Sequence, residues 1–350
     1  MRSNVSSLFS DEGTNLHAKV IAIYILLIAT NIAAWLWALA AFHNYPILLG
    51  TATLAYTFGL RHAFDADHIA AIDNVTRKLM QEGKRPVAVG FFFSLGHSTI
   101  VAAASLLIAL TASSLEQRFP GLIEVGGVIG TLVSVLFLFA IAMINIMVLA
   151  AIYRILQRVR RGHSYADEEL NAFLAQRGLL GRLLRTLSRL ISRSWHMYPL
   201  GFLFGLGFDT ATEIGLLGVS AAEASNGLSI WSILVFPALF TAGMSLVDTS
   251  DGVLMVGAYG WAFRDPVRKL YYNLTITGVS AAVAVGVGAI EALGLVVERL
   301  GLVGGIRDTA DLAAGHFDLL GYFVIGIFVA SWLISLAIYR AMRNRKIGSA

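Results

Sequence analysis

The chain has 350 residues, of which 57% are hydrophobic and only 14% are charged, and its formal net charge is +4. Since a soluble domain carries about 25% charged residues, this composition excludes an ordinary soluble domain and indicates an integral membrane protein. The absence of cysteine excludes disulfides, thiolate metal sites and thiol chemistry.

Eight segments are long and apolar enough to cross a bilayer, which takes about 20 residues of helix. In chain order the predicted spans are 20–42, 46–71, 86–112, 121–153, 198–222, 229–260, 273–297 and 317–339. The sequence therefore predicts an all-α, polytopic integral membrane protein with eight transmembrane helices and a single domain, 1–350. The sixth span contains Pro237, where we expect a kink.

The basic residues predict the orientation of these spans. With both ends in the cytoplasm, every Lys and Arg except Arg61, Arg118, Arg299 and Arg307 falls on the cytoplasmic side. The cytoplasmic parts are then the N-terminal segment 1–19, a basic loop 154–197 between the fourth and fifth spans, and the tail 340–350. The positive charge thus reflects topology and contact with anionic lipid, so no nucleic acid is expected as a partner.

Two pairs of segments resemble each other. "FGLRHAFDAD" (58–67) is similar to "FGLGFDTATE" (204–213), and "FSLGHS" (93–98) is similar to "FTAGMS" (240–245). Because the second and third spans run opposite to the fifth and sixth in this topology, the pairs would form an inverted repeat, an arrangement that often holds a midplane site. Such short matches also arise by chance in apolar sequence, and both alternatives stay open.

The second span carries an unusual set of titratable side chains. Each Asp or Arg inside a bilayer costs about 2.5–3.5 kcal/mol on insertion scales. One interpretation is that the helix has already reached water here, with Asp73, Arg77 and Lys78 beyond it. The other is a binding site, formed by the residues Arg61, His62, Asp65, Asp67 and His68.

Similar side chains in three other spans favour the binding site. Taken singly, His97 could be a hydrogen-bonded packing residue, and each acidic pair could be a structural partner of a hydroxyl or of Arg61. The two acidic pairs are spaced i,i+4 and i,i+3, so each pair faces one direction. Together these side chains predict a cation pathway; they are His97 in the third span, Asp209 and Glu213 in the fifth, and Asp248 and Asp251 in the sixth.

The ligand types narrow the cation. Imidazole with carboxylate and no sulfur suits Ni²⁺, Co²⁺, Zn²⁺ or Mn²⁺, whereas carboxylates alone suit Mg²⁺ or Ca²⁺. On a regular helix His62, Asp65 and His68 form one stripe, and Asp67 points away from it. Either Asp67 meets another helix or supports the ligands from outside, or the helix is distorted, with Gly59 as a candidate hinge.

Four motifs in order resemble those of the nickel/cobalt transporter family, and in particular its bacterial high-affinity nickel permeases. They are "RHAFDADHI" (61–69), "FSLGHSTIV" (93–101), "LGFDTATE" (206–213) and "GMSLVDTSDG" (243–252). The family core on the second helix corresponds to His62, Asp67 and His68, and Phe64 resembles the nickel-preferring variant.

The resemblance implies a high-affinity secondary transporter that imports Ni²⁺ across the bacterial cytoplasmic membrane for nickel enzymes. A cobalt or broader divalent importer is the alternative. The expected metal ligands are His62, Asp65, Asp67, His68 and His97. The expected supporting residues of the pathway are Arg61, Asp209, Glu213, Asp248 and Asp251.

Other functions fit the sequence less well. A histidine-box metalloenzyme needs several histidines at short spacings, but the remaining histidines are scattered and HExxH is absent, so no enzyme activity is expected. Ni²⁺ would be the cargo, and no resident cofactor is expected. The GxxxxGK[ST] pattern is also absent, so no ATPase subunit is expected. A metal sensor without transport, and proton coupling through the carboxylates, stay open.

Overall fold

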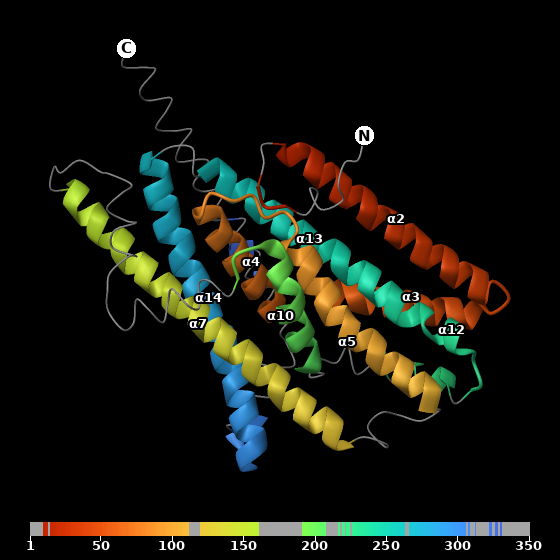
Figure 1. Ribbon diagram of the computed structural model, residues 1–350. Helices are drawn as coiled ribbons and strands as arrows, with labels where there is room; N and C mark the ends of the chain where they lie inside the picture. The colour runs from red at the N-terminus through yellow and green to blue at the C-terminus, as the bar shows by residue number, and fades with distance from the viewer. Residues whose placement is uncertain are drawn as a thin grey trace.

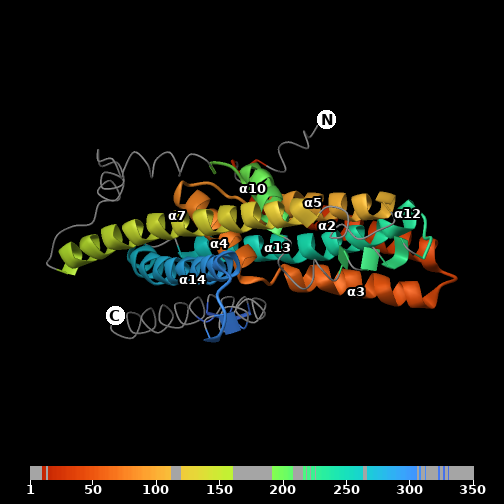
Figure 2. The same cartoon turned by 90° about the horizontal axis from the view of Figure 1, so that it is seen from below.

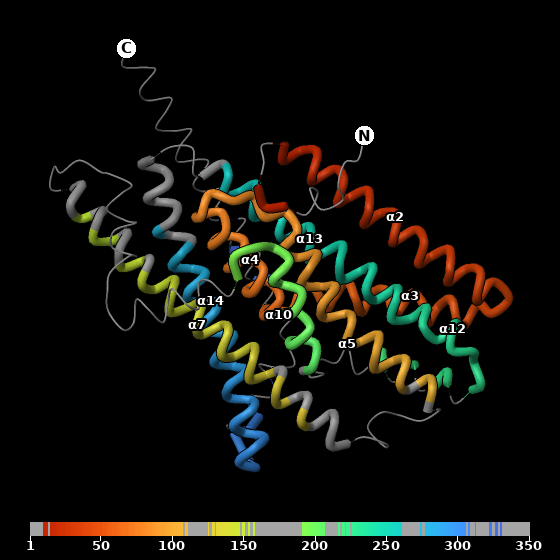
Figure 3. Tube along the Cα trace, viewed as in Figure 1, coloured from red at the N-terminus to blue at the C-terminus, as the bar shows by residue number. Residues whose placement is uncertain are grey.

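The computed structural model describes the helices that surround the candidate site. The described residues, coloured in Figure 3, are 10–12, 15–111, 120–160, 191–207, 216–262 without 218, 221 and 225, 266–305, and a few positions between 307 and 330. All regular structure within these ranges is helical, which confirms the all-α prediction for this part of the chain. The longer helices in Figure 1 are α2 (Leu16–Phe42), α3 (Pro46–His62), α4 (Ala66–Gln81), α5 (Val89–Thr111), α7 (Pro120–Arg160), α10 (Met197–Phe204), α13 (Val235–Ala262) and α14 (Pro266–Leu300).

Short helical turns precede or follow some of them: η1 (Ser194–His196), η2 (Gly205–Gly207) and α12 (Ile230–Ile233). The sixth predicted span is interrupted at Leu234, between α12 and α13, and Pro237 lies in the first turn of α13, where the ring is tolerated.

Four helical segments in the described ranges are long and apolar enough to cross a membrane, which agrees with an integral membrane protein. They are Leu16–Phe42, Val89–Leu107, Ile230–Gly260 and Thr277–Leu300. The number of eight spans stays a prediction, because most of the eighth span and part of the fifth lie outside the described residues. The same holds for positions 161–190 of the basic loop, most of the N-terminal segment 1–19 and the tail 340–350.

Helix α13 is central to the arrangement. It packs against α2, α3, α4 and α5, while α14 lies along α7 and α10 crosses α5 (Figure 1). Helices α5 and α13 run in opposite directions in both views (Figures 1 and 2). The apolar core between α2, α3 and α13 includes Phe42 and Phe236, whose rings stack at 5.5 Å.

The second predicted span is not one helix. α3 ends at His62 and α4 begins at Ala66, so the predicted span 46–71 comprises the whole of one helix and the start of the next. Asp65 adopts an extended backbone conformation, with φ −63° and ψ 142°, as the N-cap of α4. The distortion that the sequence left open therefore exists, but Gly59 is not the hinge, since it lies within α3 and packs on α13.

The second half of this span is enclosed by protein. Arg77 is only 1% exposed, and its Nη1 and Nη2 donate to Thr277 Oγ1 and Asn74 Oδ1, both at 2.9 Å. Asp73 is fully buried and accepts hydrogen bonds from the hydroxyls of Tyr259 and Ser280. The interpretation that the helix has reached water at Asp73 and Arg77 is therefore wrong, and Arg77 is not a solvated charge of a cytoplasmic loop.

Candidate metal centre

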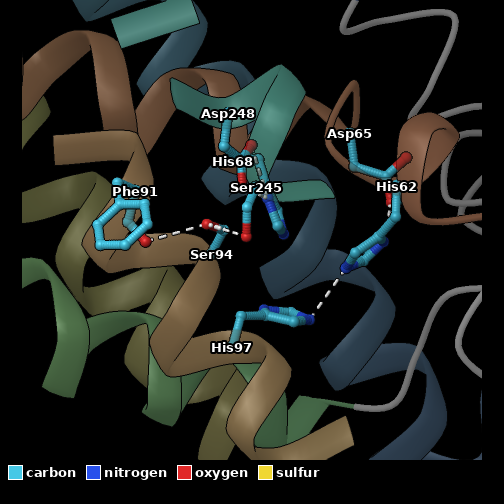
Figure 4. A network of polar contacts seen from close by, with 8 residues as sticks. All are labelled: His62, Asp65, His68, Phe91, Ser94, His97, Ser245 and Asp248. Atoms are coloured by element: carbon cyan, nitrogen blue, oxygen red, sulfur yellow. Dashed lines mark hydrogen bonds and ion pairs between the residues drawn. The ribbon is translucent and has the colours of Figure 1, made fainter. Parts of the chain in front are cut away.

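Three buried histidines converge between α3, α4 and α5 (Figure 4). One ring nitrogen of each of His62, His68 and His97 lies within 4.8 Å of the corresponding atoms of the other two. The three residues are 2%, 0% and 3% exposed, so the group is closed off from solvent. Within the described residues this is the set of His, Asp and Glu side chains that could hold a metal ion.

The break between α3 and α4 brings two of these rings together. On an unbroken helix, His62 and His68 would lie about 9 Å apart along the axis and about 120° apart around it. In the structure their ring centroids are 4.6 Å apart. His62 lies at the end of α3 and His68 in the first turn of α4, so the extended residue Asp65 redirects the chain between them.

Two carboxylates contact the Nδ1 atoms of His62 and His68. Nδ1 of His62 lies 2.8 Å from Oδ2 of Asp65, and Nδ1 of His68 lies 3.3 Å from both carboxylate oxygens of Asp248. Since a carboxylate accepts hydrogen bonds, each contact assigns the proton to Nδ1 and leaves Nε2 with its lone pair. Nε2 of His68 has no hydrogen-bond partner among the described residues.

The third histidine adds a candidate ligand from a third helix, α5. Nε2 of His97 lies 3.0 Å from Nε2 of His62 (Figure 4). The centre therefore offers inward-facing imidazole nitrogens with carboxylates outside them. This arrangement is the one that protein metal sites use to fix the tautomer and raise the basicity of a ligating histidine.

Aromatic rings and hydroxyls line the rest of the centre. Phe93 lies edge-on to His68 with ring centroids 4.8 Å apart, and Phe240 lies 5.6 Å from His62. The hydroxyl of Ser94 donates to that of Ser245 at 3.0 Å, which joins α5 to α13 beside the centre (Figure 4). An apolar wall of this kind lowers the local dielectric and strengthens every electrostatic contact inside it.

The structure separates the other candidate residues. Asp67 is half-buried and lies outside the group of three histidines, and Arg61 is exposed. Asp251 is buried one turn beyond Asp248 on α13. Asp209 and Glu213 lie outside the described residues.

Sequence reasoning missed the pairing of Asp248 with His68 and the two phenylalanines. For the two phenylalanines the sequence did contain a pattern. The similar motifs "FSLGHS" and "FTAGMS" each begin with the phenylalanine that contacts an imidazole.

Imidazole with nearby carboxylate and no sulfur is a donor set that suits divalent transition metals of intermediate softness, such as Ni²⁺, Co²⁺ and Zn²⁺. The fold and the site thus describe an integral membrane protein with a buried group of three histidines and two carboxylates, a donor set that suits such a cation.

Comparison with known proteins specifies the family. A family model described as "High-affinity nickel-transport protein" matches residues 48–338, and the chain belongs to this family of transporters. The high-affinity nickel transport protein of Cupriavidus necator is 59% identical over 326 residues, which is 93% of each chain. The hydrogenase nickel incorporation protein HupN of Bradyrhizobium diazoefficiens is 54% identical over 317 residues, 90% of this chain and 83% of the relative.

A cobalt transporter is also similar. The cobalt transport protein NhlF of Rhodococcus rhodochrous is 43% identical over 288 residues, 81% of each chain. No solved structure matches the chain. The family resemblance predicted from the four motifs is therefore confirmed, and the family consists of transporters rather than enzymes.

Proposed function

We propose that this protein is a secondary transporter that imports Ni²⁺ across the bacterial cytoplasmic membrane and supplies nickel enzymes. The observation that carries the proposal is the convergence of His62, His68 and His97 in a buried centre, with their ligand atoms within 4.8 Å of one another. The names of the relatives from Cupriavidus necator and Bradyrhizobium diazoefficiens support nickel as the cargo.

In this proposal the imidazoles replace water around a cation that has shed part of its hydration shell. Asp65 and Asp248 place negative charge behind His62 and His68, which compensates the charge of a dication in a low-dielectric interior. Asp67, in the family core, would take part during entry or exit from its half-buried position.

The buried acids beyond the centre extend the polar route. Asp251 lies one turn after Asp248 on α13, and Asp73 lies on the facing helix α4. We infer that the cation leaves the histidines along this side. An inside-negative potential of 100 mV favours entry of a dication by about 4.6 kcal/mol, at about 2.3 kcal/mol per charge.

We further infer the predicted orientation for the whole chain 1–350 as one domain. Eight spans, cytoplasmic termini and a cytoplasmic basic loop at 154–197 fit the distribution of Lys and Arg. In this orientation α2 carries the chain outward, so the turn between α2 and α3 lies outside and α5 begins at the cytoplasmic face.

Uptake of radioactive nickel by energised cells tests the proposal. His97→Ala and His62→Ala should each abolish uptake above the background of cells without the protein, at equal protein levels in the membrane. The matched control is His43→Ala, since His43 is exposed at the end of α2, away from the centre. Unchanged uptake in the His62 and His97 variants, or uptake in vesicles that survives collapse of both membrane potential and pH gradient, would contradict the proposal.

Cobalt import is the second candidate function, because a relative at 43% identity is a cobalt transport protein. Both cations accept imidazole and carboxylate ligands. Competition of unlabelled Co²⁺ against labelled Ni²⁺ in the same uptake assay distinguishes the two. Nickel import predicts that Co²⁺ in equal amount leaves most of the nickel uptake in place.

A further inference from the structure

Two helix crossings in the molecule are built in the same way. Where α3 crosses α13, a Cβ added to Gly59 would lie 2.1 Å from the carbonyl oxygen of Phe240. Where α10 crosses α5, a Cβ added to Gly201 would lie 2.1 Å from the carbonyl oxygen of Phe93. In both crossings, only glycine allows the backbones to approach this closely.

A reciprocal glycine contact accompanies each crossing. A Cβ on Gly243 of α13 would lie 2.8 Å from the oxygen of Tyr56, and one on Gly96 of α5 would lie 2.0 Å from the oxygen of Tyr198. Each crossing therefore joins a Tyr-x-x-Gly helix to a Phe-x-x-Gly helix. In each crossing the Tyr-x-x-Gly helix ends at the same distance from its glycine. α3 ends three residues after Gly59, and α10 ends three residues after Gly201.

The helices of one crossing run in the opposite direction to the corresponding helices of the other. Helices α5 and α13 are antiparallel (Figures 1 and 2). The segment leading into α10 lies at the end of α4, where Lys78 and Lys84 donate to the carbonyls of Ile191 and Ser192. Helix α3 begins instead at the turn that follows α2. These relations are those of an inverted repeat that pairs α3 and α5 with α10 and α13.

The contacts also set the register of the repeat. Tyr56 and Gly59 correspond to Tyr198 and Gly201, whereas the motif "FGL" in the sequence would pair Gly59 with Gly205. The contacts thus differ from the sequence register by four residues, about one turn of helix.

In this register the two phenylalanines are equivalent, and each contacts the last residue of the helix that it crosses. Phe240 lies 5.6 Å from His62, and Phe93 lies 5.3 Å from Phe204. Phe93 also contacts His68 at 4.8 Å, so the two phenylalanine rings pack against different histidines of the centre. Both phenylalanines are 0% exposed.

We propose that Phe240 and Phe93 are the outer and inner gates of the metal centre, occupying equivalent positions in an inverted repeat. The assignment of sides rests on the orientation given under the proposed function. There, α13 enters from outside and Phe240 lies in its second turn, while α5 enters from the cytoplasm and Phe93 lies in its second turn. Each ring closes one side of the histidines to water and ions, and transport requires the two to open in turn.

Accessibility of an introduced thiol tests the gates without depending on transport. The chain has no cysteine, so Ser245→Cys gives a single reporter. Ser245 lies five residues after Phe240 on α13 and bonds Ser94, the neighbour of Phe93, so it lies between the two gates. A membrane-impermeant cationic thiosulfonate is applied to intact cells for the outer side and to inverted vesicles for the inner side.

With both gates present, we expect slow labelling from either side. Phe240→Ala should raise the labelling rate about tenfold from the outside only, and Phe93→Ala should do so from the inside only. The matched control is Phe236→Ala, because Phe236 is equally buried one turn earlier on α13 but stacks on Phe42. If an alanine variant fails to reach the membrane, Phe240→Leu or Phe93→Leu should give a smaller change on the same side.

The proposal would be overturned if the gate variants are labelled no faster than the Phe236 control. It would also be overturned if both variants are labelled faster from the same side, or if Phe240→Ala speeds labelling from the inside and Phe93→Ala from the outside. Nickel uptake by the unmodified chain is measured in parallel. If that chain takes up no nickel while the labelling pattern is as expected, the proposed function fails and the gates stand.

Discussion

Nε2 of His62, at the end of α3, and Nε2 of His97, on α5, form a hydrogen bond of 3.0 Å. Two nitrogens bound 2.1 Å from a metal lie about 3.0 Å apart at a right angle and about 3.4 Å apart at a tetrahedral angle. Right angles occur in the square-planar and octahedral complexes that Ni²⁺ forms, whereas Zn²⁺ prefers a tetrahedron. A cation that replaced the shared proton without changing the 3.0 Å spacing of these two nitrogens would bind them at about a right angle, a geometry that Ni²⁺ accepts.

This relationship predicts selectivity against zinc. In equilibrium dialysis of purified protein with both ions, Ni²⁺ should be retained over Zn²⁺ by about tenfold, or about 1.4 kcal/mol. X-ray absorption of the nickel-loaded protein should show imidazole nitrogens in a non-tetrahedral site. Preferential retention of zinc would contradict the geometric argument.

Removal of the carboxylate behind His68 should weaken nickel binding without unfolding the protein. Asp248→Asn keeps the size of the side chain but removes the charge that holds Nδ1–H of His68. Loss of such an outer contact costs about 10–100-fold in metal affinity. Isothermal titration with Ni²⁺ measures the change, and Ser250→Ala, on the same helix but bonded to Tyr24, should leave the affinity unaltered.

The close approach of α3 to α13 predicts different outcomes for two glycines of one helix. Gly59→Ala would place a methyl group 2.1 Å from the oxygen of Phe240, so the helices must separate and little folded protein should reach the membrane. Gly50→Ala has no atom within 4 Å of the added carbon and should fold normally. Protein levels in membranes and thermal unfolding in detergent compare the two. Normal folding of the Gly59 variant would show that this crossing tolerates separation.

The buried carboxylate of Asp73 should make the protein sensitive to loss of one hydroxyl. Tyr259→Phe removes a hydrogen bond to Asp73 and leaves only Ser280 as a hydroxyl donor among the contacts described above. Hydrogen bonds to charged groups contribute about 1.5–3 kcal/mol, so the variant should unfold at a lower temperature. Tyr45→Phe, at an exposed tyrosine, is the control and should unfold as the parent does.

Helical class and membrane character followed from the sequence because they depend on composition and on long apolar runs. The break after His62 did not, because no proline or glycine marks residues 63–65. The burial of Arg77 was also hidden, since its partners Thr277 and Asn74 include a residue 200 positions away. Positive charge alone cannot distinguish such a contact from a cytoplasmic loop.

For the site, the sequence supplied the residue types but not their arrangement. His62, His68 and His97 were all candidates, and the structure brings these three together. Periodicity placed Asp65 on the same stripe as the histidines but could not show that it lies behind His62 as a hydrogen-bond acceptor. The partner of His68 comes from α13, and such a contact between distant helices depends on packing that periodicity does not describe.

The enclosure of α4 has a consequence for how the chain enters the bilayer during synthesis. Its neighbours α13 and α14 are made later, and they supply Tyr259, Ser280 and Thr277, which bond Asp73 and Arg77. A nascent chain that ends before α13 would leave Asp73 without its two hydroxyl donors and Arg77 with Asn74 of α4 but without Thr277, at a cost of several kcal/mol in hydrocarbon. Helix α4 therefore reaches its final place only after the C-terminal helices have been synthesised, so insertion of this protein cannot proceed strictly from the first helix to the last.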